Sequence, residues 1–288
     1  SGAFNPIYHT ILRKMNPIDF SLATIKDEYL YGDAAPWVIG FSGGKDSTCM
    51  LQLVWIAMQQ IKEAGQPLDR RIIISSNDTA IENPLIADLL YRTVQAIKDA
   101  AQSEGMPIEC HITRPRLTEQ FWVKVIGNGY PIPNNTFRWC TDRLKIQPTS
   151  RMINDVLGQY KEAVLLLGTR RSESKTREKS IQRNSQRGKR LSNHPTHYGL
   201  KVFSPIAELD VEHVWQVIRS MPCPWGSNQE LFDLYAGANS DDYECPTVIT
   251  DKAHKTCGQS RFGCWICPVV KKDKSMTALV NSGNERLR

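Results

Sequence analysis

A short segment early in the chain has the composition of a phosphate-binding loop. The apolar residues 37–41 are followed by the six residues of this loop: Ser42, Gly43, Gly44, Lys45, Asp46 and Ser47. Two adjacent glycines allow backbone N–H groups to turn towards an anion, a following helix adds the positive end of its dipole, and the lysine adds a full charge. The segment is not a Walker A motif, because Asp46 stands where that motif has Ser or Thr. It predicts a phosphate site, with ATP as the expected ligand.

Two carboxylates lie near this segment. A carboxylate beside a bound phosphate is repelled unless a cation bridges them, so Asp46 leads us to expect Mg²⁺ together with ATP. Asp78 follows the second apolar run, residues 71–75. Its carboxylate or backbone is placed to contact the adenosine of a nucleotide, and capping of the next helix is an alternative role.

A second group of candidate phosphate ligands follows the apolar residues 163–167. Gly168 opens a stretch in which residues 170–201 contain ten Lys and Arg against two Glu. Guanidinium groups make bidentate contacts with phosphate and can stabilise a departing pyrophosphate. We therefore predict ligand contacts for Arg170, Glu173 and Arg177, and a polyanion as the partner of the basic stretch.

The cysteines indicate a metal site. Four of the eight gather near the carboxyl-terminal end as Cys245-x11-Cys257-x6-Cys264-x2-Cys267. Thiolates are soft ligands, and four of them suit zinc and a [4Fe–4S] cluster equally well. The nearby Phe262, Trp265 and Pro268 would shield a cluster from water, which favours iron–sulfur over zinc.

A further thiol, Cys140, lies apart from these four. Arg143 and Lys145 follow it closely, and nearby positive charge is expected to lower the pKa of a thiol and so suit it to nucleophilic work. Cys140 is accordingly a candidate catalytic residue, and it is also an alternative ligand for the metal.

Composition places the chain among soluble globular proteins. It has 288 residues, of which 41% are apolar, and this length and apolar fraction are enough for a substantial core. The formal net charge is +6. No apolar run approaches the length that spans a membrane, and residues 1–4 lack the features of a signal peptide. We expect a cytoplasmic protein without a membrane partner.

The elements that position these residues alternate between strands and helices. Apolar runs predict strands at 37–41, 71–75, 108–112, 163–168 and 201–206, and apolar periodicity predicts helices at 48–63 and 83–103. Further helices are expected at 117–126, after Asp210 and around 230–235, with a long polar excursion at 175–197. This order predicts an α/β fold with a doubly wound, mainly parallel sheet whose ligands lie beyond the carboxyl ends of the strands.

Three of the motifs resemble those of known families. Residues 42–47 resemble the PP-loop of ATP pyrophosphatases, which split ATP into AMP and pyrophosphate while adenylating a substrate. Residues 168–177 resemble the arginine element of the phosphoadenylylsulfate reductases. The segment Cys-Thr-Asp-Arg-Leu-Lys-Ile-Gln-Pro from Cys140 resembles an element of the iron–sulfur adenylylsulfate reductases, with Trp139 in place of their first cysteine. Cys140 either supplies a cluster ligand or carries sulfur as a persulfide.

Together with residues 260–267, these motifs resemble the DndC/SspD family of DNA phosphorothioation proteins, from about Trp37 to Met276. The resemblance implies an ATP pyrophosphatase that helps to replace a non-bridging oxygen of the DNA backbone with sulfur. It implies ATP, Mg²⁺ and a [4Fe–4S] cluster as cofactors, and a cysteine desulfurase, DNA and other phosphorothioation proteins as partners. The implied organisation is a helical lead-in at 1–36, a PP-loop domain of the adenine nucleotide α-hydrolase type at 37–220, and a cysteine-cluster segment at 221–288 packed on that domain.

Three other functions remain open from the sequence. Sulfonucleotide reduction would use the same loop, although the reductases' Glu-Cys-Gly-Leu-His segment does not occur in this sequence. Thiolation of tRNA would keep the adenylation chemistry and change the nucleic acid. A zinc-bearing DNA-binding module would have a degenerate nucleotide loop and no turnover.

Overall fold

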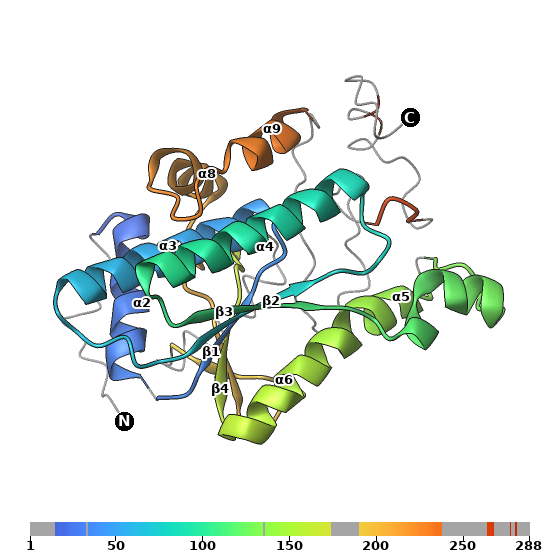
Figure 1. The fold of residues 1–288 in the computed structure, drawn as a ribbon, viewed down its shortest axis with the longest axis horizontal. Helices are drawn as coiled ribbons and strands as arrows, with labels where there is room; N and C mark the ends of the chain where they lie inside the picture. The colour runs from blue at the N-terminus through green and yellow to red at the C-terminus, as the bar shows by residue number, and fades with distance from the viewer. Residues whose placement is uncertain are drawn as a thin grey trace.

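A six-stranded sheet organises the chain (Figure 1). The computed structural model describes residues 15–32, 34–134, 136–173, 190–237, 264–267, 277 and 280. The strands are β1 (Trp37–Gly40), β2 (Ile72–Asn77), β3 (Ile108–Thr113), β4 (Ala163–Leu166), β5 (Ser192–Asn193) and β6 (Leu200–Phe203). Their order is β3-β2-β1-β4-β6-β5, and all neighbours are parallel except β5, which is antiparallel to β6. The predicted α/β, mainly parallel fold is confirmed.

The strand order creates one switch point. Trp37 of β1 lies opposite Ile72 of β2 on one side and Val164 of β4 on the other. The chain moves outward from β1 to β2 and β3, and then returns to place β4 on the opposite side of β1. In open α/β sheets, ligands bind beyond the carboxyl ends of the strands at such a reversal. The loops after β1 and β4 therefore flank the expected binding crevice.

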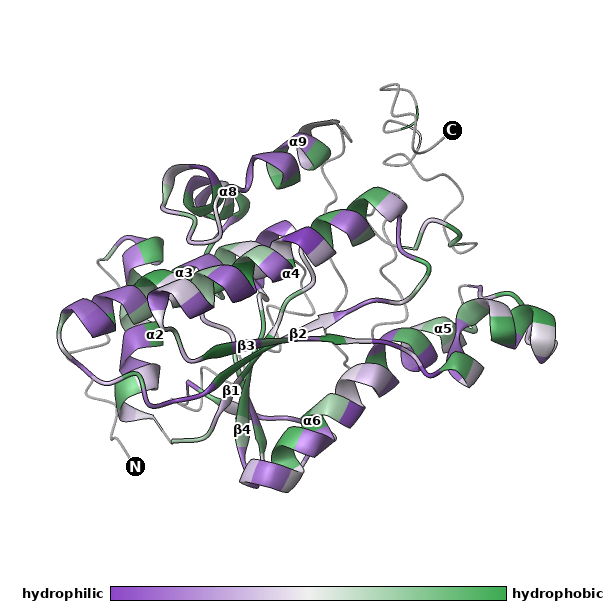
Figure 2. Cartoon of the chain, viewed as in Figure 1, coloured by the Kyte–Doolittle hydropathy of each residue, from purple (hydrophilic) through white to green (hydrophobic). Residues whose placement is uncertain are grey.

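Alternating side chains of the central strands bury both faces of the sheet. The first face packs against α2 (Pro17–Tyr31), α3 (Lys45–Glu63), α4 (Pro84–Glu104) and α8 (Val211–Ser220), and the opposite face packs against α6 (Gln147–Tyr160). Trp37 and Ile39 belong to the first core, whereas Val38 packs with Ile153 of α6. The two layers are visible on either side of the sheet in Figure 1, and the apolar strands between them in Figure 2.

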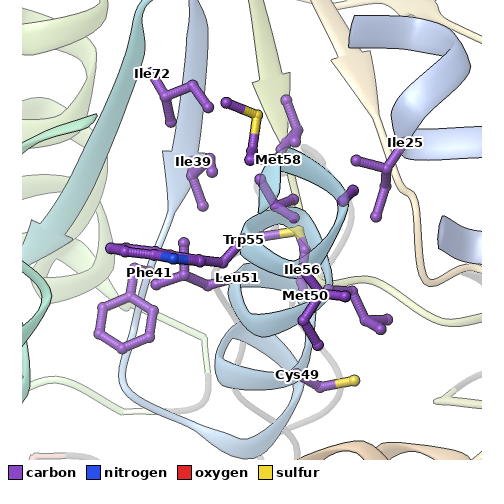
Figure 3. Close-up of a cluster of buried hydrophobic side chains, with 14 of the residues drawn as sticks. Ile25, Ile39, Phe41, Cys49, Met50, Leu51, Trp55, Ile56, Met58 and Ile72 are labelled. Atoms are coloured by element: carbon purple, nitrogen blue, oxygen red, sulfur yellow. The ribbon is translucent and has the colours of Figure 1, made fainter. Parts of the chain in front are cut away.

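Helix α3 is the most deeply buried helix segment around the site. Most of its residues from Lys45 to Met58 are inaccessible to solvent, and Figure 3 shows Met50, Leu51 and Trp55 in the cluster that it forms with Phe41 of the preceding loop. Cys49 is fully buried on this helix. Because the helix is fixed along its length by this packing, its first turn is held in place beside β1 and β4.

Side chains cap the amino termini of α4 and α8. The Asn83 side chain accepts a hydrogen bond from the Leu85 N–H at 2.9 Å, with Pro84 in the first turn of α4. Asp210 accepts from the His213 N–H at 2.9 Å at the start of α8. These side chains satisfy N–H groups that have no partner within the helix.

Other expectations differ from the structure. Residues 117–126 form a 3₁₀ turn (Leu117–Glu119) and a π-helical turn (Val123–Gly127) instead of one helix. Strand β3 lies at the sheet edge and is only partly buried, because it has one neighbouring strand. Residues 174–189 of the predicted excursion lie outside the described part of the chain, whereas 192–193 form β5.

The described residues bear on some of the remaining expectations. Helix α2 lies in the predicted lead-in, and α9 (Gln229–Gly237) opens the predicted cysteine-cluster segment. Most of the remainder of that segment lies outside the described residues. No helix among the described residues is long and apolar enough to cross a membrane.

Candidate functional site

The loop between β1 and α3 is closed by its own serines. Gly43 has φ +74°, in the left-handed region that favours glycine. The Ser42 and Ser47 hydroxyls lie 3.0 Å apart, and the Ser47 hydroxyl also donates to the Gly44 carbonyl at 3.0 Å. The loop thus ends at the amino terminus of a 19-residue helix, where backbone N–H groups and the helix dipole favour an anion.

Gly168 allows β4 to approach this loop closely. A Cβ atom at position 168 would lie 2.9 Å from the carbonyl carbon and oxygen of Asp46 and 3.0 Å from the Ser47 nitrogen. Real Cβ atoms do not come so near to backbone atoms, so a larger residue would push the first turn of α3 away from β4. We predict Gly168 as a nucleotide-binding residue from the sequence, and this contact stays a prediction; the structure adds a steric role for it.

One carboxylate joins the two cations of the site. Asp46 Oδ1 accepts from Arg170 Nε at 2.7 Å, and its Oδ2 lies 3.1 Å from Lys45 Nζ. The Lys45 and Arg170 side chains are only 5% and 4% exposed, and that of Asp46 11%. Arg170 Nη1 also donates to the Ser172 hydroxyl at 2.8 Å. Residues predicted from the loops after β1 and β4 thus meet at the switch point of the sheet.

This arrangement changes the argument for Mg²⁺. A metal ion was expected because Asp46 needed a cation beside a phosphate. In the structure Lys45 and Arg170 already neutralise this carboxylate. Mg²⁺ therefore stays a prediction that Asp46 by itself does not require.

A residue that the sequence reasoning missed completes the loop. The Lys45 N–H donates to the hydroxyl of Tyr235, which belongs to α9, at 3.1 Å. The two residues are 190 positions apart. An aromatic residue in a short helix carries no local signal that it contacts a phosphate loop.

Asp78 is buried at the carboxyl end of β2. Its Oδ2 accepts from the Tyr91 hydroxyl at 2.6 Å and from Arg114 Nε at 2.9 Å, and its Oδ1 accepts from the Ala80 N–H at 2.8 Å. Asn83, not Asp78, caps α4, so the capping alternative for Asp78 is excluded. Contact with adenosine stays a prediction.

Cys140 packs against a small apolar cluster beyond the sheet. We call it the Trp139 cluster; its buried members are Ile81, Phe121, Trp139 and Leu144, and Cys140 and Cys264 contact it. Cys264 forms an antiparallel bridge with Glu82, and the Trp265 N–H donates to the Ile81 carbonyl at 3.2 Å. Residues from the cysteine-rich tail are thereby held against the loop that follows β2, next to Cys140.

The predicted low pKa of Cys140 is wrong. Burial raises the pKa of this thiol, and the nearby Cys267 raises it further, against smaller opposing effects that include the charge of Lys145. Burial also raises the pKa of Cys264, to about 12. Removal from water outweighs the basic residues that follow Cys140 in the sequence. An unassisted thiolate nucleophile is therefore not favoured at this position.

The predicted metal ligands are only partly within the described residues. Cys245 and Cys257 lie outside them. Among the described residues, no three His, Cys, Asp or Glu side chains form a group that could hold a metal ion. The three described thiols Cys140, Cys264 and Cys267 do have the soft donor chemistry that suits an iron–sulfur cluster. The ligand set stays a prediction.

Two predicted residues of the arginine element cannot be placed fully. Residues Arg171–Glu173 form a 3₁₀ turn, but the Glu173 side chain and all of Arg177 lie outside the described part. Arg171 turns away from the loop and pairs with Glu208 at 2.7 Å. Arg170 is thus the member of this element whose position at the site is defined.

Comparisons by sequence find a family and a relative for this chain. The model of the phosphoadenosine phosphosulfate reductase domain matches residues 36–269. An uncharacterized protein of Methanocaldococcus jannaschii is 26% identical over 239 residues, which cover 82% of this chain and 37% of that protein. The chain thus spans well under half the length of the curated relative that it matches.

Two solved structures are similar to this chain at lower sequence identity. The phosphoadenylyl-sulfate reductase from Candida auris, in a phosphate complex, has a TM-score of 0.45 and 14% identity, covering 82% of this chain and 94% of that one. The U34-tRNA thiolase NcsA from Methanococcus maripaludis, with its [4Fe–4S] cluster, has a TM-score of 0.40 and 14% identity, covering 75% and 70%.

Proposed function

This chain belongs to the phosphoadenosine phosphosulfate reductase domain family, and from that premise we propose that it cleaves ATP between the α- and β-phosphates. One observation carries the proposal: Lys45 and Arg170, from loops on either side of the switch point, meet on the Asp46 carboxylate at the amino terminus of α3. Two buried cations beside helix N–H groups form a site for a polyphosphate. The products are AMP and pyrophosphate.

The chemistry follows from these positions. The loop N–H groups and Lys45 bind the phosphates, and an oxygen of the acceptor attacks the α-phosphorus. The new P–O bond forms as the bond between the α-phosphorus and the bridging oxygen breaks, and pyrophosphate leaves with the electron pair. Arg170, oriented by Asp46 and Ser172, stabilises the charge on that leaving group. Such prearranged charges act strongly in a site that excludes water.

The proposed acceptor is a phosphate of the DNA backbone, which adenylation activates for replacement of an oxygen by sulfur. Two features of the sequence support this assignment. One is the basic stretch from Arg170 to Lys201, and the other is the joint occurrence of the four motifs at residues 42–47, 140–148, 168–177 and 260–267. A cysteine desulfurase is the proposed sulfur source. A [4Fe–4S] cluster bound by Cys245, Cys257, Cys264 and Cys267, with Cys140 as an alternative ligand, would supply a position for sulfur.

Sulfonucleotide reduction is the second candidate, and the family match favours it. The domain that matches residues 36–269 is named for reductases of phosphoadenosine phosphosulfate. In that case the same loop would bind the phosphate of a sulfonucleotide, and sulfite would be the product.

Product analysis separates the candidates. The chain is incubated with α-labelled ATP and, separately, with adenylylsulfate or phosphoadenylylsulfate and a thiol reductant, with duplex DNA present or absent. Pyrophosphate release that DNA stimulates, with an equal amount of the labelled adenylyl group recovered on the DNA or as AMP, supports the proposal. Sulfite release from the sulfonucleotides without ATP cleavage would replace it by the second candidate, and ADP with phosphate would contradict both.

A further inference from the structure

Tyr235 occupies a position that a bound phosphate would need. Its hydroxyl accepts the Lys45 N–H at 3.1 Å, and it lies 3.4 Å from where a Cβ atom on Gly44 would be. The hydroxyl oxygen is thus at the mouth of the loop, at the amino terminus of α3. An N–H group at this place is one that a phosphate oxygen is expected to take. The single Lys45 N–H group cannot make a full hydrogen bond to the Tyr235 hydroxyl oxygen and to a phosphate oxygen at the same time.

The base of the segment that carries Tyr235 is fixed. Asn228 precedes α9 and is buried, and its side-chain amide donates to Gln52 Oε1 of α3 at 2.9 Å. Gln52 in turn donates to the carbonyls of Met221 and Pro222 at 2.9 and 2.8 Å. Trp225 Nε1 donates to Asn228 Oδ1 at 3.2 Å. Because all these groups are satisfied in the core, the connection between α8 and α9 is held on α3.

The rest of α9 is held by one buried apolar side chain, by ring contacts and by an exposed ion pair. Leu231 is buried in the main core, and the Phe232 ring contacts Trp215 of α8 with the centroids 5.6 Å apart. Arg92 of α4 pairs with Glu230 at 2.6 Å, but both side chains are about half exposed, and exposed pairs contribute little to stability. Towards the end of α9, the Tyr235 ring makes an edge contact with Trp215 of α8, with the centroids 5.2 Å apart. The contact between the Tyr235 hydroxyl and Lys45 thus lies at the end of α9 that is away from the buried base.

We propose that Tyr235 is a phosphate surrogate that competes with the ligand for the loop. Its hydroxyl accepts the Lys45 N–H, and a nucleotide or pyrophosphate that binds the loop displaces it and moves the end of α9. The ligand then binds more weakly than it would to an open loop, because part of its binding energy is used to displace the tyrosine. The inference rests on the proposed function, since it takes a phosphate as the ligand of the loop.

The first test compares pyrophosphate binding to the full chain and to Tyr235→Phe by titration calorimetry. The substitution keeps the ring and removes the competing oxygen, so we expect pyrophosphate to bind about three- to tenfold more tightly, the range for one hydrogen bond. Tyr198→Phe is the matched control, because that side chain is fully exposed, and its affinity should equal that of the wild type. Unchanged or weaker binding by Tyr235→Phe would overturn the inference.

Hydrogen exchange gives a second, independent readout. With pyrophosphate bound to the wild type, N–H groups at the end of α9 should exchange faster and those of the first turn of α3 more slowly. Slower exchange in both segments would show that Tyr235 stays in place as a ligand contact, and would also overturn the inference. Wild-type chain that fails to bind pyrophosphate and ATP would contradict the proposed function itself, whereas normal binding with no effect of Tyr235→Phe would contradict only the displacement.

Discussion

The Nε atom of Arg170 donates a hydrogen bond to Oδ1 of Asp46 at 2.7 Å, between residues 124 positions apart in the sequence. This bond joins the loop after β4 to the first turn of α3. Because the other oxygen of the same carboxylate lies 3.1 Å from Lys45 Nζ, Asp46 sets the separation of the two cations. In the proposed reaction the phosphates of ATP take over this bridging role.

Replacement of Asp46 by Asn should destabilise the ligand-free protein more than the bound one. The amide keeps the shape of the side chain but leaves the buried Lys45 and Arg170 without their compensating charge, which should lower the free energy of unfolding by about 3 kcal/mol. Saturating pyrophosphate should reduce this loss, because phosphate oxygens then pair with both cations. Urea unfolding with and without pyrophosphate measures the difference.

A matched substitution controls for loss of an ion pair as such. Asp88 pairs with Arg92 at 3.3 Å on the exposed face of α4, so Asp88→Asn should lower the free energy of unfolding by less than about 1 kcal/mol. Pyrophosphate should not alter that value. An equal loss for Asp46→Asn in the presence and absence of pyrophosphate would contradict the bridging role.

Gly168→Ala should displace the loop. The new methyl group would lie 2.9 Å from the backbone of Asp46, so we expect a loss of about 1–3 kcal/mol in stability and a reduced rate of pyrophosphate release. Gly158→Ala is the control, because nothing lies within 4 Å of a Cβ atom at this position in α6. Alanine there should stabilise the helix by about 0.5–1 kcal/mol. A neutral effect of Gly168→Ala on both properties would show that the close approach is unimportant.

Cys140→Ser should reduce the iron bound after anaerobic reconstitution. Cys140 and Cys264 contact the same Trp139 cluster, and this proximity to a cysteine of the tail favours a ligand role for Cys140 over that of a sulfur carrier. Cys110→Ser, on the edge strand β3, is the matched control and should retain its iron. Full iron content in Cys140→Ser would return Cys140 to the role of sulfur carrier and leave Cys245 as the fourth ligand.

Local sequence patterns predicted the central part of the fold. The apolar runs around β1, β2 and β4 and the glycines of the loop specify strands, buried helices and a turn through interactions between close neighbours in sequence. The rule that parallel strands end at a common edge then placed Lys45 near Arg170. Their meeting on Asp46 follows from that rule, although the exact pairing does not.

Features that depend on distant contacts were missed. Tyr235 reaches Lys45 only because Gln52 and Asn228 hold α9 above α3, and no pattern within residues 229–237 encodes that contact. The pKa of Cys140 was misjudged because adjacent basic residues are visible in the sequence, whereas its burial against Trp139 is not. Strand β3 was predicted as a strand, but its position at the edge of the sheet is set by strand order.

The most direct test of the central claim is pyrophosphate release from ATP by the wild type and by Lys45→Ala. We expect the wild type to release pyrophosphate, with an equal amount of the adenylyl group recovered on the acceptor or as AMP. We expect Lys45→Ala to lower the rate at least about hundredfold, with the circular dichroism spectrum of the fold unchanged. Undiminished pyrophosphate release by a folded Lys45→Ala variant would contradict the assignment of this loop as the site of α–β cleavage.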